Sequence, residues 1–247
     1  MNLGSMDIKE LTIIFGTTRG LGAALYDVAS QRNSDCLVVN RKVVELKRPN
    51  DKGAVVDLSQ PLTDKQLAGL FNMVDLNQYA VIKLIANASI IGPIKVVGDA
   101  QGLVIKETML TNAVNYMVVI NAFIAATKKL VASKRVLVIS SGAAESPTHG
   151  LATYCASKAA IEMFVKTVAQ EPHENFEIMA FRPGVMDTDM QATLRSADSK
   201  DFINAQQYRH LQKDGQLRSP SSVAQIIFKL LDAKIQWTQA IVDINEL

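Results

Sequence analysis

LTIIFGTTRGLG, residues 11–22, is the stretch that decides the fold. Its first five residues are apolar and lie between a charged segment and a glycine, which predicts a short buried strand. A glycine-rich segment, residues 16–22, follows at once, and residues 23–30 have a helical pattern. This order is the context of a dinucleotide-binding loop, because glycines let the backbone approach a pyrophosphate and the helix N-terminus supplies amide donors. Glycine turns are also common without a ligand, so the loop alone leaves both interpretations open.

Further apolar runs continue the alternation of strand and helix. Strands are predicted at residues 36–39, 54–56, 79–85, 135–139, 176–181 and 240–244, and helices at residues 63–71, 103–131 and 151–170, with a last helix capped by Ser219. Such alternation implies a parallel sheet that is covered on both faces. We therefore predict an α/β fold, a single-domain Rossmann-type doubly wound parallel sheet of about seven strands. One domain takes up residues 1–247, without an internal repeat or a linker.

The composition narrows the class of protein. The chain has 247 residues, 48% of them hydrophobic and 20% charged, so it can bury a substantial core. The net charge of +2 is spread out and gives no stripe for nucleic acid. Cys36 and Cys155 lack metal-ligand spacing, which predicts no metal site and a reducing compartment. No signal peptide is apparent, so we expect a cytoplasmic protein, and residues 1–6 are expected to be an unstructured leader.

Residues 109–127 are an uncharged stretch of 19 residues, which approaches the length of a membrane-spanning helix. Asn112, Asn115 and Asn121 lie within it and would be costly in hydrocarbon. A helix buried in the domain or in a subunit interface explains the stretch better, and no membrane partner is expected. A buried asparagine is more often a structural hydrogen-bonding group than a catalytic one, so the residues alone leave the role of Asn112 open.

Ligands bind such sheets at the carboxyl ends of the strands. There an NAD-binding fold carries an acidic residue after its second strand, but this chain has Asn40 and Arg41. Arg41 and Arg19 could both pair with a 2′-phosphate, which a guanidinium matches in shape. They favour NADP(H), although two arginines can also be ordinary surface residues. Several polar or small residues lie within two positions after the end of a predicted strand: Gly16, Arg41, Asp57, Asn87, Ser141 and Pro183.

ISSGAAESPTHGLATYCASK, residues 139–158, carries the candidate chemistry. Ser141 follows a predicted strand, and Tyr154 and Lys158 lie four residues apart, on one face of a helix. A phenol titrates near ~10 in water, and a neighbouring ammonium lowers that pKa. A serine hydroxyl can hydrogen-bond a carbonyl oxygen. The spacing therefore predicts a proton donor beside a carbonyl-binding group, although Tyr-x-x-x-Lys alone usually marks a solvated helix face.

Residues 189–218 are polar and irregular or loosely helical in pattern. A long segment of this kind in a compact domain is often a lid or a binding loop. Apolar side chains within it could cover a flat substrate, and they are Met190, Leu194, Phe202 and Tyr208.

With these motifs assembled, the chain resembles the short-chain dehydrogenase/reductase family over essentially its whole length. The family's T-G-x-x-x-G-x-G appears as residues 15–22, with Phe15 in place of threonine. Its N-N-A-G turn is altered to Ala86-Asn87-Ala88-Ser89. Its P-G-x-x-x-T matches Pro183, Gly184 and Thr188, which in the family hold the nicotinamide carboxamide.

The resemblance implies a catalytic set of Ser141, Tyr154, Lys158 and Asn112, with Asn115 a weaker candidate for the last position. It implies that Tyr154 donates a proton, that Ser141 binds the carbonyl oxygen, and that Lys158 bonds the nicotinamide ribose, lowers the pKa of Tyr154 and joins a water relay to Asn112. The predicted cofactor-binding residues are Gly16, Thr18, Arg19, Gly20, Leu21, Gly22, Asn40, Arg41, Asp57, Leu58, Asn87, Ala88, Ser89, Tyr154, Lys158, Pro183, Gly184, Val185 and Thr188.

Within the family, residues 183–191, PGVMDTDMQ, look like the stretch in sepiapterin reductases and bacterial benzil reductases. Those relatives use NADPH to reduce one carbonyl of a vicinal dicarbonyl. The resemblance thus implies an NADPH-dependent oxidoreductase for an activated carbonyl, with Ser141 and Tyr154 contacting the substrate. Family members commonly pair through the helices at residues 103–131 and 151–170, so a homodimer or homotetramer is expected. The alternative is a non-catalytic NADP-binding sensor, which would not need a proton donor.

Overall fold

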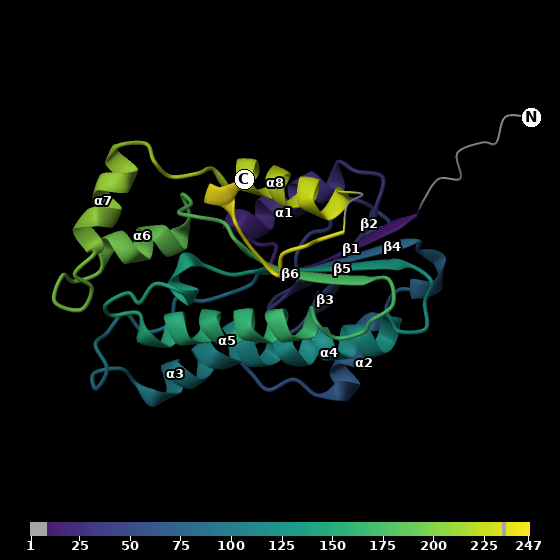
Figure 1. Cartoon of the computed structure of the whole chain (residues 1–247), viewed down its shortest axis with the longest axis horizontal. Helices are drawn as coiled ribbons and strands as arrows, with labels where there is room; N and C mark the ends of the chain where they lie inside the picture. The colour runs from purple at the N-terminus through teal and green to yellow at the C-terminus, as the bar shows by residue number, and fades with distance from the viewer. Residues whose placement is uncertain (1–8, 234–235) are drawn as a thin grey trace, which may run out of the picture.

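The computed structural model describes residues 9–233 and 236–247, so the expectation for residues 1–6 lies outside the described residues. A parallel sheet lies between two layers of helices, in the strand order β3-β2-β1-β4-β5-β6-β7 (Figure 1). Its strands are β1 Glu10–Phe15, β2 Asp35–Asn40, β3 Lys52–Val55, β4 Val81–Ala86, β5 Ser133–Ile139, β6 Phe176–Arg182 and β7 Ile241–Asp243. The predicted doubly wound sheet is confirmed.

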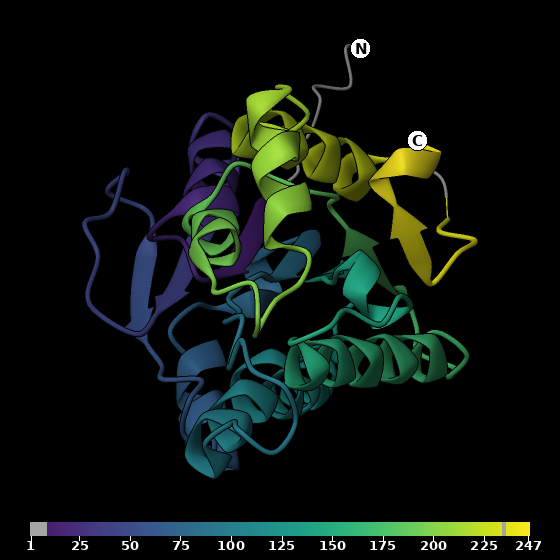
Figure 2. The same cartoon turned by 90° about the vertical axis from the view of Figure 1, so that its left-hand side faces the viewer.

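Helices cover both faces of the sheet, as Figure 1 shows. On one face lie α1 Gly20–Ser30 and α8 Pro220–Asp232, which pack on each other. On the other face lie α2 Asp64–Phe71, α4 Asn115–Thr127 and α5 Ala152–Val168, with α3 Gly102–Met109 leading into them. The remaining helices, α6 Asp189–Ser196 and α7 Ala205–Lys213, lie across one end of the sheet (Figure 2).

The alternation of side chains along β1 explains the two cores. Leu11, Ile13 and Phe15 point toward the α2, α4 and α5 layer, whereas Ile14 points toward α1 and α8. All four side chains are fully buried, which a strand reaches only when both faces of its sheet are covered. The short apolar run that opened the sequence is therefore the centre of the molecule.

The predicted helix over residues 103–131 is divided in the structure. A π-helical segment, Leu110–Val114, separates α3 from α4, and α4 ends at Thr127. The apolar pattern continues to Val131, but the chain must turn there to enter β5, and Val131 is 91% exposed. By length and composition this helical stretch, Gly102–Thr127, could cross a membrane, yet Val119, Ile120 and Phe123 within it are fully buried against the sheet. It is a core helix.

The segment over residues 189–218 is more regular than its sequence pattern indicates. It forms α6, whose first turn Thr188 caps, and then α7, which packs on α6. The predicted cap of the last helix is confirmed, because the Ser219 hydroxyl accepts a hydrogen bond from the Ser222 amide at 3.1 Å.

The strand order reverses between β1 and β4, which creates a switch point at their carboxyl ends. Phe15 and Ala86 are register partners there, so the loops that begin at Gly16 and Asn87 leave the sheet side by side. Ligands of open parallel sheets bind in the crevice at such a point.

Candidate active site

The glycine loop is shaped by close backbone contacts. Gly16 has φ +83°, and a Cβ there would lie 2.7 Å from the Cβ of Ala88. Gly22 is more restricted, since its Cβ would lie 1.7 Å from the carbonyl oxygen of Gly16. The Asn87 side chain donates a hydrogen bond to that same oxygen at 2.7 Å. Asn87, from the end of β4, thus fastens the loop that follows β1, and the sequence pattern of a small-residue turn did not reveal this role.

The start of α1 is suited to an anion. Among the described residues no side chain caps α1, and its first turn, from Gly20, contains no acidic residue. The first amides of a helix lack partners within the helix and carry the positive end of its dipole. Together with the close glycine loop, they form a site that fits the pyrophosphate of a dinucleotide.

Asn40 proves to shape the loop. Its side chain is buried, accepts a hydrogen bond from the Thr17 amide at 2.7 Å and donates one to the Thr17 hydroxyl at 2.9 Å. Asn40 was predicted among the cofactor-binding residues, and the structure places its side chain behind the loop.

Arg41 and Arg19 are both exposed near the end of the sheet. Hydrogen bonds from the Ser59 amide and hydroxyl lower the pKa of Asp57, and the charge of Arg41 contributes, which places Arg41 near the exit of β3. Arg19 lies 3.3 Å from the Asp189 carboxylate at the start of α6. Leu58, next to Asp57, is buried, and its carbonyl accepts a hydrogen bond from Asn115 at 2.8 Å.

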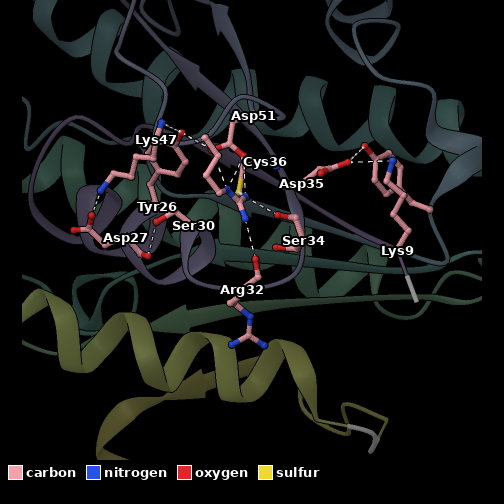
Figure 3. Close-up of polar contacts among 12 residues, drawn as sticks. Lys9, Tyr26, Asp27, Ser30, Arg32, Ser34, Asp35, Cys36, Lys47 and Asp51 are labelled. Carbon is pink, nitrogen blue, oxygen red and sulfur yellow. Dashed lines mark hydrogen bonds and ion pairs between the residues drawn. The ribbon is translucent and has the colours of Figure 1, made fainter. Parts of the chain in front are cut away.

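A buried polar cluster anchors the loop that begins at Arg41 (Figure 3). The Tyr26 hydroxyl of α1 donates to Asp51 at 2.7 Å and accepts from the Lys47 amide at 2.8 Å. Arg48 bonds the same Asp51 at 2.8 Å. Burial, followed by the Asp51 charge, raises the pKa of the Cys36 thiol to about 12, so this cysteine is an inert part of the cluster. The cluster was not predicted, because its members are far apart in the sequence.

Ser141, Tyr154 and Lys158 meet at the carboxyl end of β5. Ser141 lies two residues after the end of the strand and caps a short 3-10 turn, Gly142–Ala144, through its hydroxyl. Tyr154 and Lys158 lie on the inner face of α5 and are 7% and 2% exposed. The Lys158 nitrogen is 5.7 Å from the centre of the Tyr154 ring, and the Ser141 hydroxyl acts on the Tyr154 phenol as a hydrogen-bond partner.

The pKa values of this group differ from the sequence expectation. Burial raises the pKa of Tyr154 to about 12, and the hydrogen bond from Ser141 opposes the rise only in part. Burial lowers the pKa of Lys158 to about 8, against the raising influence of Glu162. The Lys158 ammonium donates to the carbonyl of Ile139 at 2.8 Å. The expected lowering of the Tyr154 pKa by Lys158 is therefore absent from the structure, and desolvation outweighs the one lowering influence, the hydrogen bond from Ser141.

Asn112 lies within the π-helical segment, and Asn115 directly follows that segment as the first residue of α4. The Asn112 amide group donates to the Ile90 carbonyl at 2.8 Å and to the Ser157 hydroxyl at 3.1 Å, and its oxygen accepts from the Ile90 amide at 2.9 Å. Only one acceptor position of that oxygen is left for a water relay. Asn115 bonds the carbonyls of Leu58 and Gln60 at 2.8 Å, so its role is structural.

An ion pair that sequence reasoning missed lies behind the serine, tyrosine and lysine. Glu162, one turn after Lys158 on α5, is 4% exposed. Its carboxylate accepts two hydrogen bonds from Arg182, both at 2.8 Å, and one from Ser140 at 2.7 Å. The one available signal was a glutamate at a core-facing position of a helix.

The helices α6 and α7 cover Tyr154. Leu194 of α6 and Phe202 between the helices pack with Leu151 and Tyr154 in one apolar cluster. Tyr208 of α7 packs on Phe202, with ring centres 5.3 Å apart, and its phenol raises the pKa of Tyr154. Within the described residues the side-chain nitrogen of the buried Gln191 has no hydrogen-bond partner, although buried amides normally have one.

The residues after β6 reach the glycine loop. A Cβ at Gly20 would lie 3.3 Å from the Thr188 methyl group, and Gly184 has φ +69° after the buried Pro183. Val185 is half-buried and its carbonyl accepts a hydrogen bond from the Arg218 amide at 3.0 Å.

A pocket of about 330 Å³ lies beside the start of α5, lined by Lys95, Val96, Val97, Pro147, Thr148, His149, Gly150, Ala152 and Cys155. It adjoins Tyr154 in the sequence but is not lined by it.

Comparison with known proteins gives concordant matches. The family model described as short chain dehydrogenase matches residues 10–199. A benzil reductase ((S)-benzoin forming) of Bacillus subtilis (strain 168) is 32% identical over 227 residues, which cover 90% of this chain and 93% of that protein. A benzil reductase of the same description from Bacillus cereus is 31% identical over 233 residues, with 90% and 94% covered. Sepiapterin reductase of Mus musculus is 36% identical over 99 residues, which cover 40% of this chain and 37% of that protein.

Solved structures share the fold. The KRED1-Pglu enzyme superposes with a TM-score of 0.80 at 20% identity, covering 94% of this chain and 100% of that one. A short chain dehydrogenase from Shigella flexneri, in complex with NADP, superposes with a TM-score of 0.78 at 15% identity, covering 97% and 98%.

Proposed function

The chain belongs to the short-chain dehydrogenase/reductase family and is an oxidoreductase, and from this premise we propose that it uses NADPH to reduce one carbonyl of a vicinal dicarbonyl. The observation that carries the proposal is the meeting of Ser141, Tyr154 and Lys158 at the same edge of the sheet as the glycine loop, with an apolar cluster over Tyr154. A pure NADP sensor would have no use for a buried phenol and ammonium at this position.

The glycine loop and the start of α1 would hold the pyrophosphate, and Arg41 with Arg19 would pair with the 2′-phosphate. The segment from Pro183 to Thr188 would hold the carboxamide end, as the resemblance to the family implies. When bound, the reduced nicotinamide supplies a hydride to the carbonyl carbon. Support for NADP(H) comes from the two exposed arginines and from the absence of an acidic residue directly after β2.

Tyr154 is suited to provide the proton. Its pKa of about 12 keeps the phenol protonated at neutral pH. The phenol O–H bond would break as the carbonyl oxygen gains the proton, while the carbonyl carbon gains the hydride. The Ser141 hydroxyl would donate a hydrogen bond to that oxygen as its charge grows, which stabilises the transition state more than the ground state. Lys158, with a pKa of about 8, is positively charged at neutral pH and would stabilise the tyrosinate left behind.

Two observations support a dicarbonyl substrate. The benzil reductases of Bacillus subtilis and Bacillus cereus align over 90% of this chain. The residues that pack with Tyr154 include Leu194 and Phe202, and such an apolar cover would accept a flat hydrophobic substrate. An adjacent carbonyl also withdraws electrons and makes hydride addition easier. Because α6 and α7 bury Tyr154, we expect them to move before a substrate can reach it.

The experiment compares kcat/KM with NADPH for benzil and 2,3-butanedione against cyclohexanone and a primary aldehyde. We expect the dicarbonyls to be preferred. Tyr154→Phe should lose ~10²–10⁴-fold in kcat, the usual contribution of general acid catalysis, while NADPH binding measured by fluorescence stays close to that of the wild type.

Equal or better activity on cyclohexanone would remove the dicarbonyl assignment and leave a general reductase. A Tyr154→Phe variant that keeps more than a few per cent of the wild-type kcat would remove Tyr154 as the proton donor. NADPH that binds but is consumed with none of these carbonyls would indicate the non-catalytic binding protein instead.

A further inference from the structure

The ion pair between Glu162 and Arg182 is built as a fork. Two nitrogens of Arg182 donate to the two oxygens of Glu162, each at 2.8 Å, and the side chains are 12% and 5% exposed. The Ser140 hydroxyl donates to Glu162 at 2.7 Å, and a third nitrogen of Arg182 contacts the exposed Glu145. Bidentate pairing of this kind fixes orientation as well as distance.

Each member of this fork is next to a residue of the predicted site. Ser140 precedes Ser141, Arg182 precedes Pro183, and Glu162 follows Lys158 by one helical turn. The fork therefore joins the end of β5, the end of β6 and the helix α5. Through its contact with Arg182, Glu145 also connects the loop after Ser141 to this ion pair. The ends of β5 and β6, the helix α5 and this loop therefore all contact one pair of charges.

Stability alone does not account for such a pair. Taking two charges out of water offsets much of their attraction, and packed apolar residues of similar size often stabilise a fold as well. The same two strands carry a second ion pair at their opposite end, where Arg135 bonds Glu177 at 2.6 Å. That pair lies far from Ser141 along β5 and serves as an internal comparison.

We propose that Glu162 and Arg182 are positioning residues, which hold Ser141 and the Pro183 segment against the helix that carries Tyr154 and Lys158. This inference rests on the proposed reductase function, because Ser141, Tyr154 and Lys158 are the groups that it positions. Neither residue touches the reacting atoms; the pair fixes the distances among the residues that do.

The charge of Glu162 also reaches Lys158. Burial lowers the pKa of Lys158, and Glu162 raises it. Two titratable groups near Lys158 are on α5 itself, Tyr154 and Glu162, and the segments packed against α5 add Arg182 on β6 and Glu145 after the 3-10 turn. Of the helices that pack on α5, α4 carries no charged residue, and α3 carries Lys106 and Glu107. Removing the Glu162 charge should therefore lower the pH at which Lys158 loses its proton.

The test uses two variants of the full chain. Glu162→Gln keeps the size and an acceptor oxygen but loses the charge, so we expect kcat to fall about tenfold or more, with an alkaline limb that moves about one pH unit lower. Arg182→Lys keeps the charge but loses the fork. It should lower kcat, leave the alkaline limb nearer its wild-type position, and speed hydrogen exchange of the backbone amides at residues 140–146 without NADPH.

Glu177→Gln is the matched control, because it makes the same change in an ion pair between the same strands. It should leave kcat, the alkaline limb and exchange at residues 140–146 as in the wild type. Wild-type kcat and an unmoved limb in both site variants would overturn the proposal, even if exchange became faster, since the pair would then be only a structural tie.

A wild-type protein that reduces no carbonyl would contradict the proposed function separately. The pH dependence of NADPH binding, read by fluorescence, then decides the inference, because Lys158 lies at the predicted ribose site. A binding curve that moves to lower pH in Glu162→Gln supports the positioning role, and an unmoved curve overturns it.

Discussion

Lys158 shows at the scale of a residue how stability and function oppose each other. The side chain is 2% exposed and its pKa is about 8, below the ordinary 10.5. Between about pH 8 and pH 10.5, Lys158 is protonated in the unfolded chain but has lost its proton in the folded chain. Stability therefore rises with pH through that window, and below pH 8 the fold bears the full penalty of a buried ammonium.

Lys158→Met should consequently make the protein more stable at pH 7. Each pKa unit corresponds to about 1.4 kcal/mol, so the fall from 10.5 to about 8 sets an upper limit of roughly 3.5 kcal/mol on the gain. The gain should shrink as the pH rises from 8 toward 10, because wild-type Lys158 then becomes neutral. Urea unfolding at several pH values measures it, with Lys166→Met, an exposed site on the same helix, as the control. A gain that is equal at pH 7 and pH 10 would contradict the burial of a charged Lys158.

At the same scale, we predict that Arg41 determines the preference between NADPH and NADH. The residue is exposed near Asp57 and follows the second strand, where an NAD-binding chain carries an acid. Arg41→Asp should weaken NADPH far more than NADH, because it removes a phosphate partner and offers a carboxylate to the ribose diol. The ratio of kcat/KM for the two cofactors measures this, and Lys52→Asp, at the amino end of β3, is the control. An unchanged ratio would show that Arg41 does not bind the 2′-phosphate.

The glycine loop is an element whose geometry tolerates no side chain at one position. A Cβ on Gly22 would lie 1.7 Å from the Gly16 oxygen and 2.6 Å from the Asn87 amide nitrogen that bonds it. Gly22→Ala should therefore push the loop away from α1 and weaken NADPH binding by an order of magnitude or more.

Gly69→Ala is the matched control for this change. Gly69 lies inside α2, and an added Cβ there meets nothing within 4 Å. The exchange should raise stability by about 0.5–1 kcal/mol through helix propensity and leave NADPH binding unchanged. Fluorescence titration with NADPH, together with thermal unfolding, tests both variants. Normal binding by Gly22→Ala would show that the pyrophosphate does not rest on this loop.

Elements were predictable from the sequence where the pattern is local. The buried run of β1, the glycines that follow it and the Ser219 cap all follow from neighbouring residues. The π-helical segment was not predictable, because the apolar pattern of residues 103–131 continues through it. The site was predicted by residue type, but the roles of Asn40 and Asn87 and the pair of Glu162 and Arg182 depend on contacts between distant segments.

At the scale of the whole molecule, the outer side of α4 and α5 carries apolar side chains. Met163 is 62% exposed and Val114, just before α4, is 41% exposed. We predict a dimer or tetramer at micromolar concentration, measured by light scattering. Met163→Arg should shift the protein toward monomer, because a charge buried in an interface is unfavourable. Val131→Arg, at an exposed site beyond the end of α4, should not. A monomeric wild-type protein would contradict the assembly.

The contact between Arg19 and Asp189 links two events that otherwise look separate. Arg19 belongs to the glycine loop, and Asp189 is the first residue of the helix α6. If Arg19 binds the 2′-phosphate as proposed, the cofactor would compete with Asp189 of α6 for one guanidinium. Both side chains are largely exposed, and such pairs contribute about 1 kcal/mol or less. We therefore predict, by thermodynamic reciprocity, that a substrate which displaces α6 strengthens cofactor binding by up to about fivefold, and that the cofactor strengthens substrate binding by the same factor.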